Sequence, residues 1–174
     1  MSNNFLRDDA TFQVPSVPVA TTSVAGSVKP DGTTITVTGD GTISAVDTDV
    51  LTSVTNSLGA DVALNNTGTY FDGPSCAQGI SGTWLAVGTV TLIDTSSAVH
   101  FNAKLWDGTT VIASARAANA GASDYITISL SGVISSPAAN IKISVQDSGS
   151  VSGKIIFNGS GNSKDSTLIV VRIA

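Results

Sequence analysis

The sequence predicts an all-β protein built as an antiparallel sandwich or jelly roll. Ser and Thr make up roughly a quarter of the 174 residues, whereas charged residues are only 12% and Glu is absent. Exposed helices favour Glu, Lys, Leu and Arg, so this composition disfavours helices. Short alternations of apolar and polar residues recur along the chain, and Asp-Gly pairs, which are strong hairpin signals, separate several of them.

A small β-hairpin is expected within residues 21–46. Ile35 and Val37 alternate with threonines, and Ile43 follows the Asp40-Gly41 pair. Gly accepts the positive φ angle that a tight hairpin turn needs, and Asp tolerates it. Further Asp-Gly pairs stand at 31–32, 72–73 and 107–108, and we interpret them as turns as well. Much of the Asp content therefore has a structural explanation.

The larger core is expected in residues 47–174. Strands are predicted at 61–64, 67–71, 83–94, 98–106, 109–117, 124–131, 139–147, 152–158 and 166–173. Several of these segments have one apolar and one polar face, as in an antiparallel sheet with one solvated side. Eight or nine short strands at this spacing favour a sandwich or jelly roll.

Two predicted strands are apolar on both faces, namely 166–173 and most of 83–94. An antiparallel strand with two dry faces must be covered on both sides. One cover is the core of the domain, and the other is either a loop of the same chain or a second subunit. If a second subunit is the outer cover, the subunit interface is expected to contain Leu168, Val170 and Ile173. Trp84 is most simply a core residue.

Residues 1–20 are predicted to form an extended arm. Val-Pro steps occur at 14–15 and 17–18, and proline pushes the preceding residue toward extended conformations. The aromatic residues of the arm have no periodic apolar partners nearby. They are either disordered or anchors that dock into another protein. The candidate anchoring residues are Phe5, Arg7, Phe12, Val14 and Val17.

Charge and cysteine content disfavour several classes of function. The net charge of −5 leaves no basic stripe to neutralise phosphates, which disfavours nucleic-acid binding. A single cysteine, Cys76, excludes an intramolecular disulfide and any multi-cysteine metal site. No apolar stretch is long enough to span a bilayer, and the N-terminus does not resemble a secretory signal. We therefore expect synthesis in the cytoplasm without membrane insertion.

The sequence offers little for catalysis. His100 is the single histidine, and neither a Gly-x-Ser-x-Gly elbow nor a phosphate-binding Gly-rich loop occurs. Asp47 and Asp49 could supply oxygens to a calcium ion, but such a site needs six to eight ligands. We expect no enzymatic activity, no cofactor and no bound metal, so a degradative enzyme is the disfavoured reading.

An aromatic residue at a strand end suggests a binding surface. Trp106 lies on the polar face of the 98–106 segment, together with His100 and Lys104. An exposed tryptophan can stack on a sugar ring or anchor an interface. These residues form a candidate glycan site, and the alternative is that a neighbouring loop partly covers the ring.

The segment from Ala20 to Ser44 contains Gly-Ser-Val-Lys-Pro, Thr-Ile-Thr-Val and Asp-Gly-Thr-Ile-Ser in that order. Over about 25 residues it resembles a segment that recurs in bacteriophage fibre and head-fibre proteins. The rest of the chain is similar in style to phage tip domains with a tumour-necrosis-factor-like jelly roll. The resemblance implies a homotrimer, with its N-terminal arm attached to the particle and its jelly roll outward.

The resemblance therefore predicts a trimeric capsid decoration or head-fibre protein on the virion surface. Its arm would bind the phage major capsid protein, and its doubly apolar C-terminal strand would form the trimer interface. The chain has almost no shaft, which favours this role over a long tail fibre. The alternative is a tail-associated appendage that binds a receptor or host-surface glycans.

Overall fold

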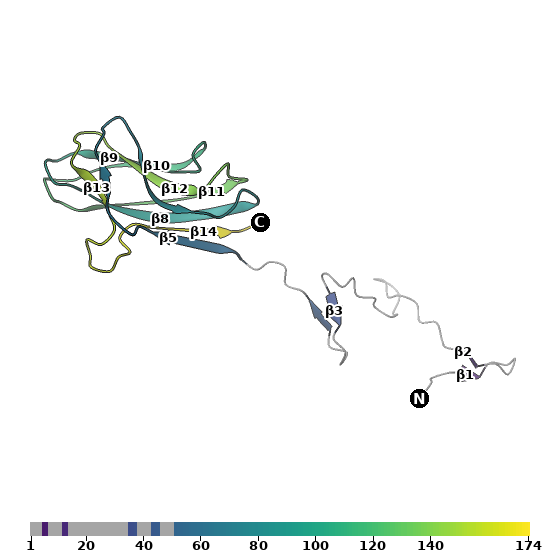
Figure 1. Cartoon of the computed structure of the whole chain (residues 1–174). Coiled ribbons are helices and arrows are strands. Elements are labelled where there is room, and N and C mark those ends of the chain that lie inside the picture. The colour runs from purple at the N-terminus through teal and green to yellow at the C-terminus, as the bar shows by residue number, and fades with distance from the viewer. Residues whose placement is uncertain (1–4, 7–11, 14–34, 38–42, 46–50) are drawn as a thin grey trace. The chain divides into compact units, whose positions relative to one another are not determined.

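The computed structural model describes residues 51–174 throughout, and residues 5–6, 12–13, 35–37 and 43–45 of the N-terminal part. The chain divides into two units, Met1–Val50 and Leu51–Ala174, and Figure 1 shows the described strands of each. In the first unit, β1 (Phe5–Leu6) pairs with β2 (Phe12–Gln13), and β3 (Ile35–Val37) pairs with β4 (Ile43–Ala45). Both pairs are antiparallel, so the hairpin predicted around Asp40-Gly41 is confirmed.

The second unit is a sandwich of two antiparallel sheets. Its strands are β5 Ser53–Ser57, β6 Val62–Leu64, β7 Phe71–Cys76, β8 Thr83–Asp94, β9 His100–Trp106, β10 Val111–Ala118, β11 Ile126–Ser135, β12 Ile141–Asp147, β13 Gly153–Ile156 and β14 Thr167–Arg172. The four-stranded sheet has the order β10-β9-β12-β7. The six-stranded sheet has the order β5-β14-β8-β13-β6, with β11 also paired to β8.

Strand β8 organises the six-stranded sheet. One of its edges pairs with β11 from Thr83 to Leu92. Its other edge pairs with β14 along the first half of the strand and with β13 along the second half. The chain passes repeatedly from one sheet to the other, as in β7 to β8 to β9 and β10 to β11 to β12. The fold is therefore an antiparallel jelly roll, as the sequence predicts.

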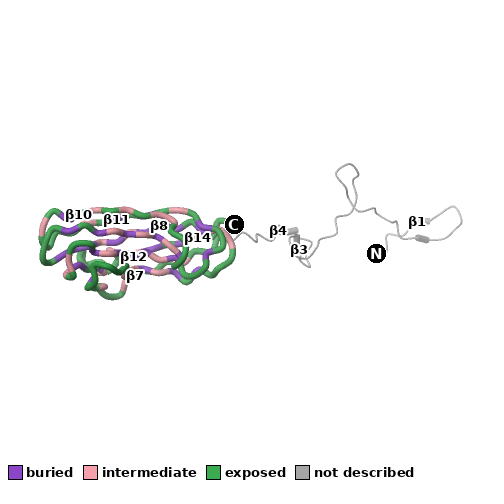
Figure 2. Tube along the Cα trace, turned by 90° about the horizontal axis from the view of Figure 1, so that it is seen from above, coloured by how far each residue is buried: buried purple, intermediate pink, exposed green. Residues whose placement is uncertain are grey.

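The core lies between the two sheets, and buried residues recur at alternate positions along the strands (Figure 2). Phe101 and Leu105 of β9 are fully buried, and so are Leu168 and Val170 of β14. Trp84 is 2% exposed, and its indole N–H donates to the carbonyl of Ser81 at 2.9 Å. The assignment of Trp84 to the core is confirmed.

Two local predictions are wrong. The strand expected at 67–71 is instead β7, Phe71–Cys76, and it includes the Asp72-Gly73 pair that the sequence suggested as a turn. Opposite β12, the register shifts between Lys142 and Ser144, so β7 carries a bulge there. A bulge on an edge strand accommodates Pro74, which cannot donate a ladder hydrogen bond. Strand β5 had no alternating apolar signal and was not predicted.

The turn at Asp107-Gly108 is confirmed. The amides of Thr109 and Thr110 donate to Asp107 Oδ1 at 2.9 and 2.6 Å. Gly108 has a φ of 93°, a conformation that side chains other than glycine rarely adopt. This turn joins β9 to β10 and places Trp106 at the end of its strand.

Candidate functional site: two outer faces and a groove

The outward strand positions of the six-stranded sheet carry no charged side chain across four neighbouring strands, and the charged residues Lys164 and Asp165 of the turn before β14 lie at one end of this surface. We call it the uncharged face. Register pairs align its outward residues, which are Ser53, Thr55 and Ser57 on β5, Thr167, Ile169 and Val171 on β14, Thr83, Leu85, Val87, Thr89 and Thr91 on β8, and Thr127, Ser129, Ser131, Val133 and Ser135 on β11. Its aliphatic side chains are clustered, because Leu85 pairs with both Val133 and Val171 and Val87 pairs with Ile169. These residues form an apolar patch on an otherwise hydroxyl-bearing surface.

The side chains of the apolar patch are open to solvent in the single chain. Leu85 is 36% exposed, Val87 44%, Val133 54% and Ile169 38%. Contiguous exposed apolar surface on a folded domain marks an interaction site more often than scattered residues do. The sequence indicated this surface through the doubly apolar strands, and the structure supplies the outward residues.

Two of the three predicted interface residues do not lie on this surface. Leu168 and Val170 are fully buried in the core of their own chain, so they cannot contact another subunit. The outward positions of the same strand are Ile169 and Val171, one residue away, because side chains alternate between the faces of a strand. Ile173 is 48% exposed, just beyond the end of β14, and remains available for a contact.

The outer surface of the four-stranded sheet is polar and charged, and we call it the charged face. Lys104 lies over the ring of Trp106, with its ammonium 3.2 Å from the ring centroid, and 4.4 Å from that of Tyr70. The indole N–H of Trp106 donates to Ser144 Oγ at 2.6 Å. Ser144 in turn donates to Asp72 at 2.6 Å. Both the ring and the indole N–H of Trp106 therefore already have partners within the chain.

The predicted glycan site is only partly assembled. Lys104 and Trp106 are in contact, but His100 lies six residues from Trp106 along β9, roughly 20 Å at the usual rise of a strand. Sequence reasoning missed Tyr70, Asp72 and Lys142, which complete the cluster. Lys142 lies on β12, Asp72 lies on the edge strand β7, and Tyr70 directly precedes β7. Lys142 binds Asp72 at 2.6 Å and lies 5.2 Å from the Trp106 ring. No local sequence signal brings these segments together.

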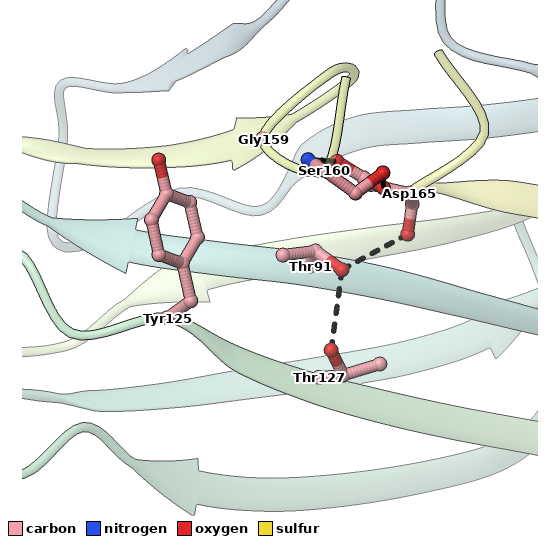
Figure 3. A pocket seen from close by; sticks show the side chains of 6 residues that line it. All are labelled: Thr91, Tyr125, Thr127, Gly159, Ser160 and Asp165. Carbon is pink, nitrogen blue, oxygen red and sulfur yellow. Dashed lines mark hydrogen bonds between the residues drawn. The ribbon is translucent and has the colours of Figure 1, made fainter. Parts of the chain in front are cut away.

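A groove opens on the six-stranded sheet beside the turn that precedes β14 (Figure 3). We call it the Tyr125 groove. It has a volume of about 330 Å³, and its lining residues are Thr91, Tyr125, Thr127, Gly159, Ser160 and Asp165. The hydroxyl of Thr91 donates to the carbonyl of Asp165 at 3.0 Å. It lies 3.2 Å from the hydroxyl of Thr127. This constellation was not predicted, since its residues come from three separate segments.

Two buried aspartates lie at one end of the sandwich, where Asp94 ends β8 and Asp147 ends β12. Burial raises the pKa of Asp94, but the hydroxyls of Ser150 and Ser96 and nearby amides outweigh it and hold that pKa well below its usual range. Burial raises the pKa of Asp147, and the neighbouring Asp94 raises it further. Asp147 Oδ2 is buried without a hydrogen-bond partner. The pair is a local site of electrostatic strain.

Within the described part of the chain, no three His, Cys, Asp or Glu side chains gather as a metal site would require. Asp47 and Asp49, the weak calcium candidates, lie outside the described residues. The same part of the chain contains no helix long and apolar enough to cross a membrane.

The candidate anchoring residues are only partly described. Phe5 and Phe12 lie in β1 and β2, and Phe12 pairs with Leu6. This pairing differs from an arm that is extended throughout. Arg7, Val14 and Val17 lie outside the described residues, so the anchoring role stays a prediction.

Solved structures of three other proteins show a distant similarity to this chain. It is similar to the Eiger TNF of S. frugiperda, with 6% identity and a TM-score of 0.44 over 71% of this chain and 93% of that chain. It is also similar to the C-terminal CBM6 of LamC, a laminarinase from Zobellia galactanivorans, with 13% identity and a TM-score of 0.33 over 79% and 86%. A chain of infectious bursal disease virus, Gt strain, shows 13% identity and a TM-score of 0.34 over 94% and 47%.

These likenesses concern the jelly-roll fold alone. No protein-family model and no curated protein matches the chain. The resemblance of residues 20–44 to phage fibre proteins therefore stays a prediction.

Proposed function

We propose that this protein is a structural subunit of a bacteriophage particle, a trimeric capsid decoration or head-fibre protein without enzymatic activity. The observation that carries the proposal is the uncharged face with its apolar patch. A lone jelly roll gains nothing from exposing Leu85, Val87, Val133 and Ile169 together, whereas burial of such side chains between subunits is favourable.

The occupant of the uncharged face is a second copy of the chain. The outward strand positions of this face carry no charge, so these faces can converge around a threefold axis with no like-charge repulsion between those positions. Its outward residues span four adjacent strands, from β5 across β14 and β8 to β11. A stable interface buries on the order of 800 Å² per partner, and a sheet face of this width is of suitable size.

The N-terminal unit is the proposed attachment to the particle, with the major capsid protein as its partner. It contains short strand pairs, and the sandwich follows it at Leu51. Segments of this kind gain order by docking on a larger surface. The protein would then lie on the virion surface, with its jelly roll free to face outward.

Two experiments test the proposal. Light scattering of the full chain at micromolar concentration should give about three times the 17.5 kDa of the monomer. Removal of residues 1–20 should leave the jelly roll folded and trimeric but abolish its binding to particles stripped of this protein. A monomeric full chain contradicts the assembly, and full occupancy by the truncated protein contradicts the attachment.

A second candidate function is binding of a receptor or glycan through the charged face. Two aromatic rings, Trp106 and Tyr70, flank the ammonium group of Lys104 there. A ligand would have to displace Lys104 to reach the Trp106 ring, which weakens the case for direct stacking. Glycan binding that is lost completely in Trp106→Ala, with no binding left at another surface, would support this function.

A further inference from the structure

We propose that the Tyr125 groove binds a neutral, hydroxyl-rich ligand, namely one sugar residue of a glycan. This inference goes beyond the assembly role and rests on a different surface from the Trp106 cluster. A sugar ring presents an apolar C–H face and an edge of hydroxyl groups. The groove offers a matching surface for each, as its two walls show.

One wall of the groove is an aromatic ring. Tyr125 is 56% exposed and stands beside the turn that contains Gly159 and Ser160 (Figure 3). A Cβ added to Gly159 would lie 3.0 Å from Cε1 of Tyr125, so the glycine lets the turn approach the ring closely. The ring is thereby held at the side of the groove. An exposed, positioned aromatic ring is a suitable surface for the C–H face of a sugar.

The opposite wall is a carboxylate that is already oriented. Both carboxylate oxygens of Asp165 accept from Ser160, one from its hydroxyl and the other from its amide at 2.7 Å. These bonds, led by that of the Ser160 hydroxyl, hold the pKa of Asp165 below its usual range, so the group is ionised at neutral pH. An ionised carboxylate has about four acceptor sites, which leaves room for two ligand hydroxyls.

The floor of the groove is neutral and polar. The hydroxyls of Thr91 and Thr127 lie 3.2 Å apart on the sheet surface and can exchange hydrogen bonds with a ligand. Asp165 is the single charged group among the lining residues. The groove should therefore reject phosphates, sulfated sugars and sugar acids, and favour a neutral hydroxylated ligand.

The groove lies at one end of the uncharged face, since Thr91 and Thr127 are outward residues of that face, and it is separate from the apolar patch. Thr91 is four residues beyond Val87 on the same face of β8, roughly 13 Å further along the strand. It is eight residues from Thr83, whose amide binds the carbonyl of Ala174 at the end of the sandwich where β5 begins. The groove is thus roughly 13 Å along β8 from Val87 of the apolar patch.

The test uses the full chain and a glycan array that contains neutral, sulfated and sialylated saccharides, followed by NMR titration with the best neutral binders. We expect saturable binding to neutral saccharides. Tyr125→Ala and Asp165→Asn should each weaken it by about tenfold or more. Tyr125→Phe keeps the ring and should bind within about threefold of the original chain. Ile80→Ala is the control, because Ile80 is 67% exposed and lies outside the groove and the charged-face cluster, and it should change nothing.

Three outcomes would overturn the inference. If the chain binds no saccharide, the proposed ligand class is wrong. A preference for anionic saccharides would contradict the charge of the groove. Binding that survives Tyr125→Ala but is lost on Trp106→Ala assigns the ligand to the charged face. The oligomeric state is measured on the same samples, so failure of the groove leaves the assembly proposal separately tested.

Discussion

The side chains on the two outer faces of the sandwich meet the solvent in opposite ways. The charged face binds its own groups to one another: Lys104 lies on Trp106, Trp106 donates to Ser144, and Lys142 pairs with Asp72. The uncharged face leaves Val87 and Ile169 exposed within an apolar patch that hydroxyl-bearing residues surround. Self-satisfied polar surface has little to gain from a partner, whereas exposed aliphatic surface gains through burial. This difference is the reason that the proposed assembly uses the uncharged face.

The largest expected effect separates the inner side of β14 from its outer side. Val170→Asp should destabilise the fold by several kcal/mol, because it places an unpaired charge in the fully buried core. Denaturant unfolding, or failure to obtain folded protein, measures this effect. Ile169→Asp on the outer side is the control, and it should leave the single chain folded while weakening assembly. Equal loss of folded protein in both variants would contradict the division of faces.

The next effect breaks the uncharged face without touching the core. Val87→Lys should shift the oligomer to monomer at micromolar concentration, since each copy would bury an ammonium group at the interface. Val111→Lys is the matched control, because Val111 is a strand valine 53% exposed, against 44% for Val87, and lies outside the apolar patch. Light scattering distinguishes the two. An unchanged oligomer in Val87→Lys would remove the uncharged face from the interface.

A smaller effect concerns the point where the two sheets meet at Asp94 and Asp147. The pKa of Asp147 is raised in the folded state, so its contribution to stability is present below its ordinary pKa and is lost as pH rises through the folded value. Asp147→Asn removes the charge beside Asp94 and replaces the unpartnered oxygen with an amide that can donate a hydrogen bond, so it should stabilise the protein at neutral pH by about 1–2 kcal/mol. The gain should fall at acidic pH.

The substitution Asp94→Asn should change the stability at neutral pH in the opposite direction. The pKa of Asp94 is lowered, so its contribution is present above its ordinary pKa and is lost as pH falls. This variant should destabilise the protein at neutral pH, with a difference that shrinks in acid. Thermal unfolding between pH 3 and 7 measures both variants, a range that brackets ordinary aspartate pKa values of about 3.9. A gain from Asp147→Asn that is independent of pH would contradict the proposed strain.

The smallest effect is expected on the charged face. Lys142→Ala removes an ion pair whose side chains are 22% and 50% exposed, so it should cost less than about 1 kcal/mol. Assembly should be unchanged. A change of oligomeric state in this variant, seen by light scattering, would indicate that the interface lies on the charged face.

The sequence alone determined the fold class and most of the strands. Period-two alternation is a local property, so segments such as 100–106 and 126–131 could be recognised as strands without knowledge of their partners. The Asp107-Gly108 turn was equally local. Strand β5 escaped because Ser53–Ser57 carries almost no apolar alternation, and Asp72-Gly73 misled because a bulge uses the same residues as a turn.

Only the tertiary structure decided which surfaces are available. A strand with apolar residues on both sides does not reveal which side meets its own core, so Leu168 and Val170 were assigned to the wrong face by one residue. The hydrogen bond from Trp106 to Ser144 and the meeting of Tyr125 with Asp165 depend on pairing between distant strands and loops. Local patterns specify what a segment forms, and long-range register specifies what it touches.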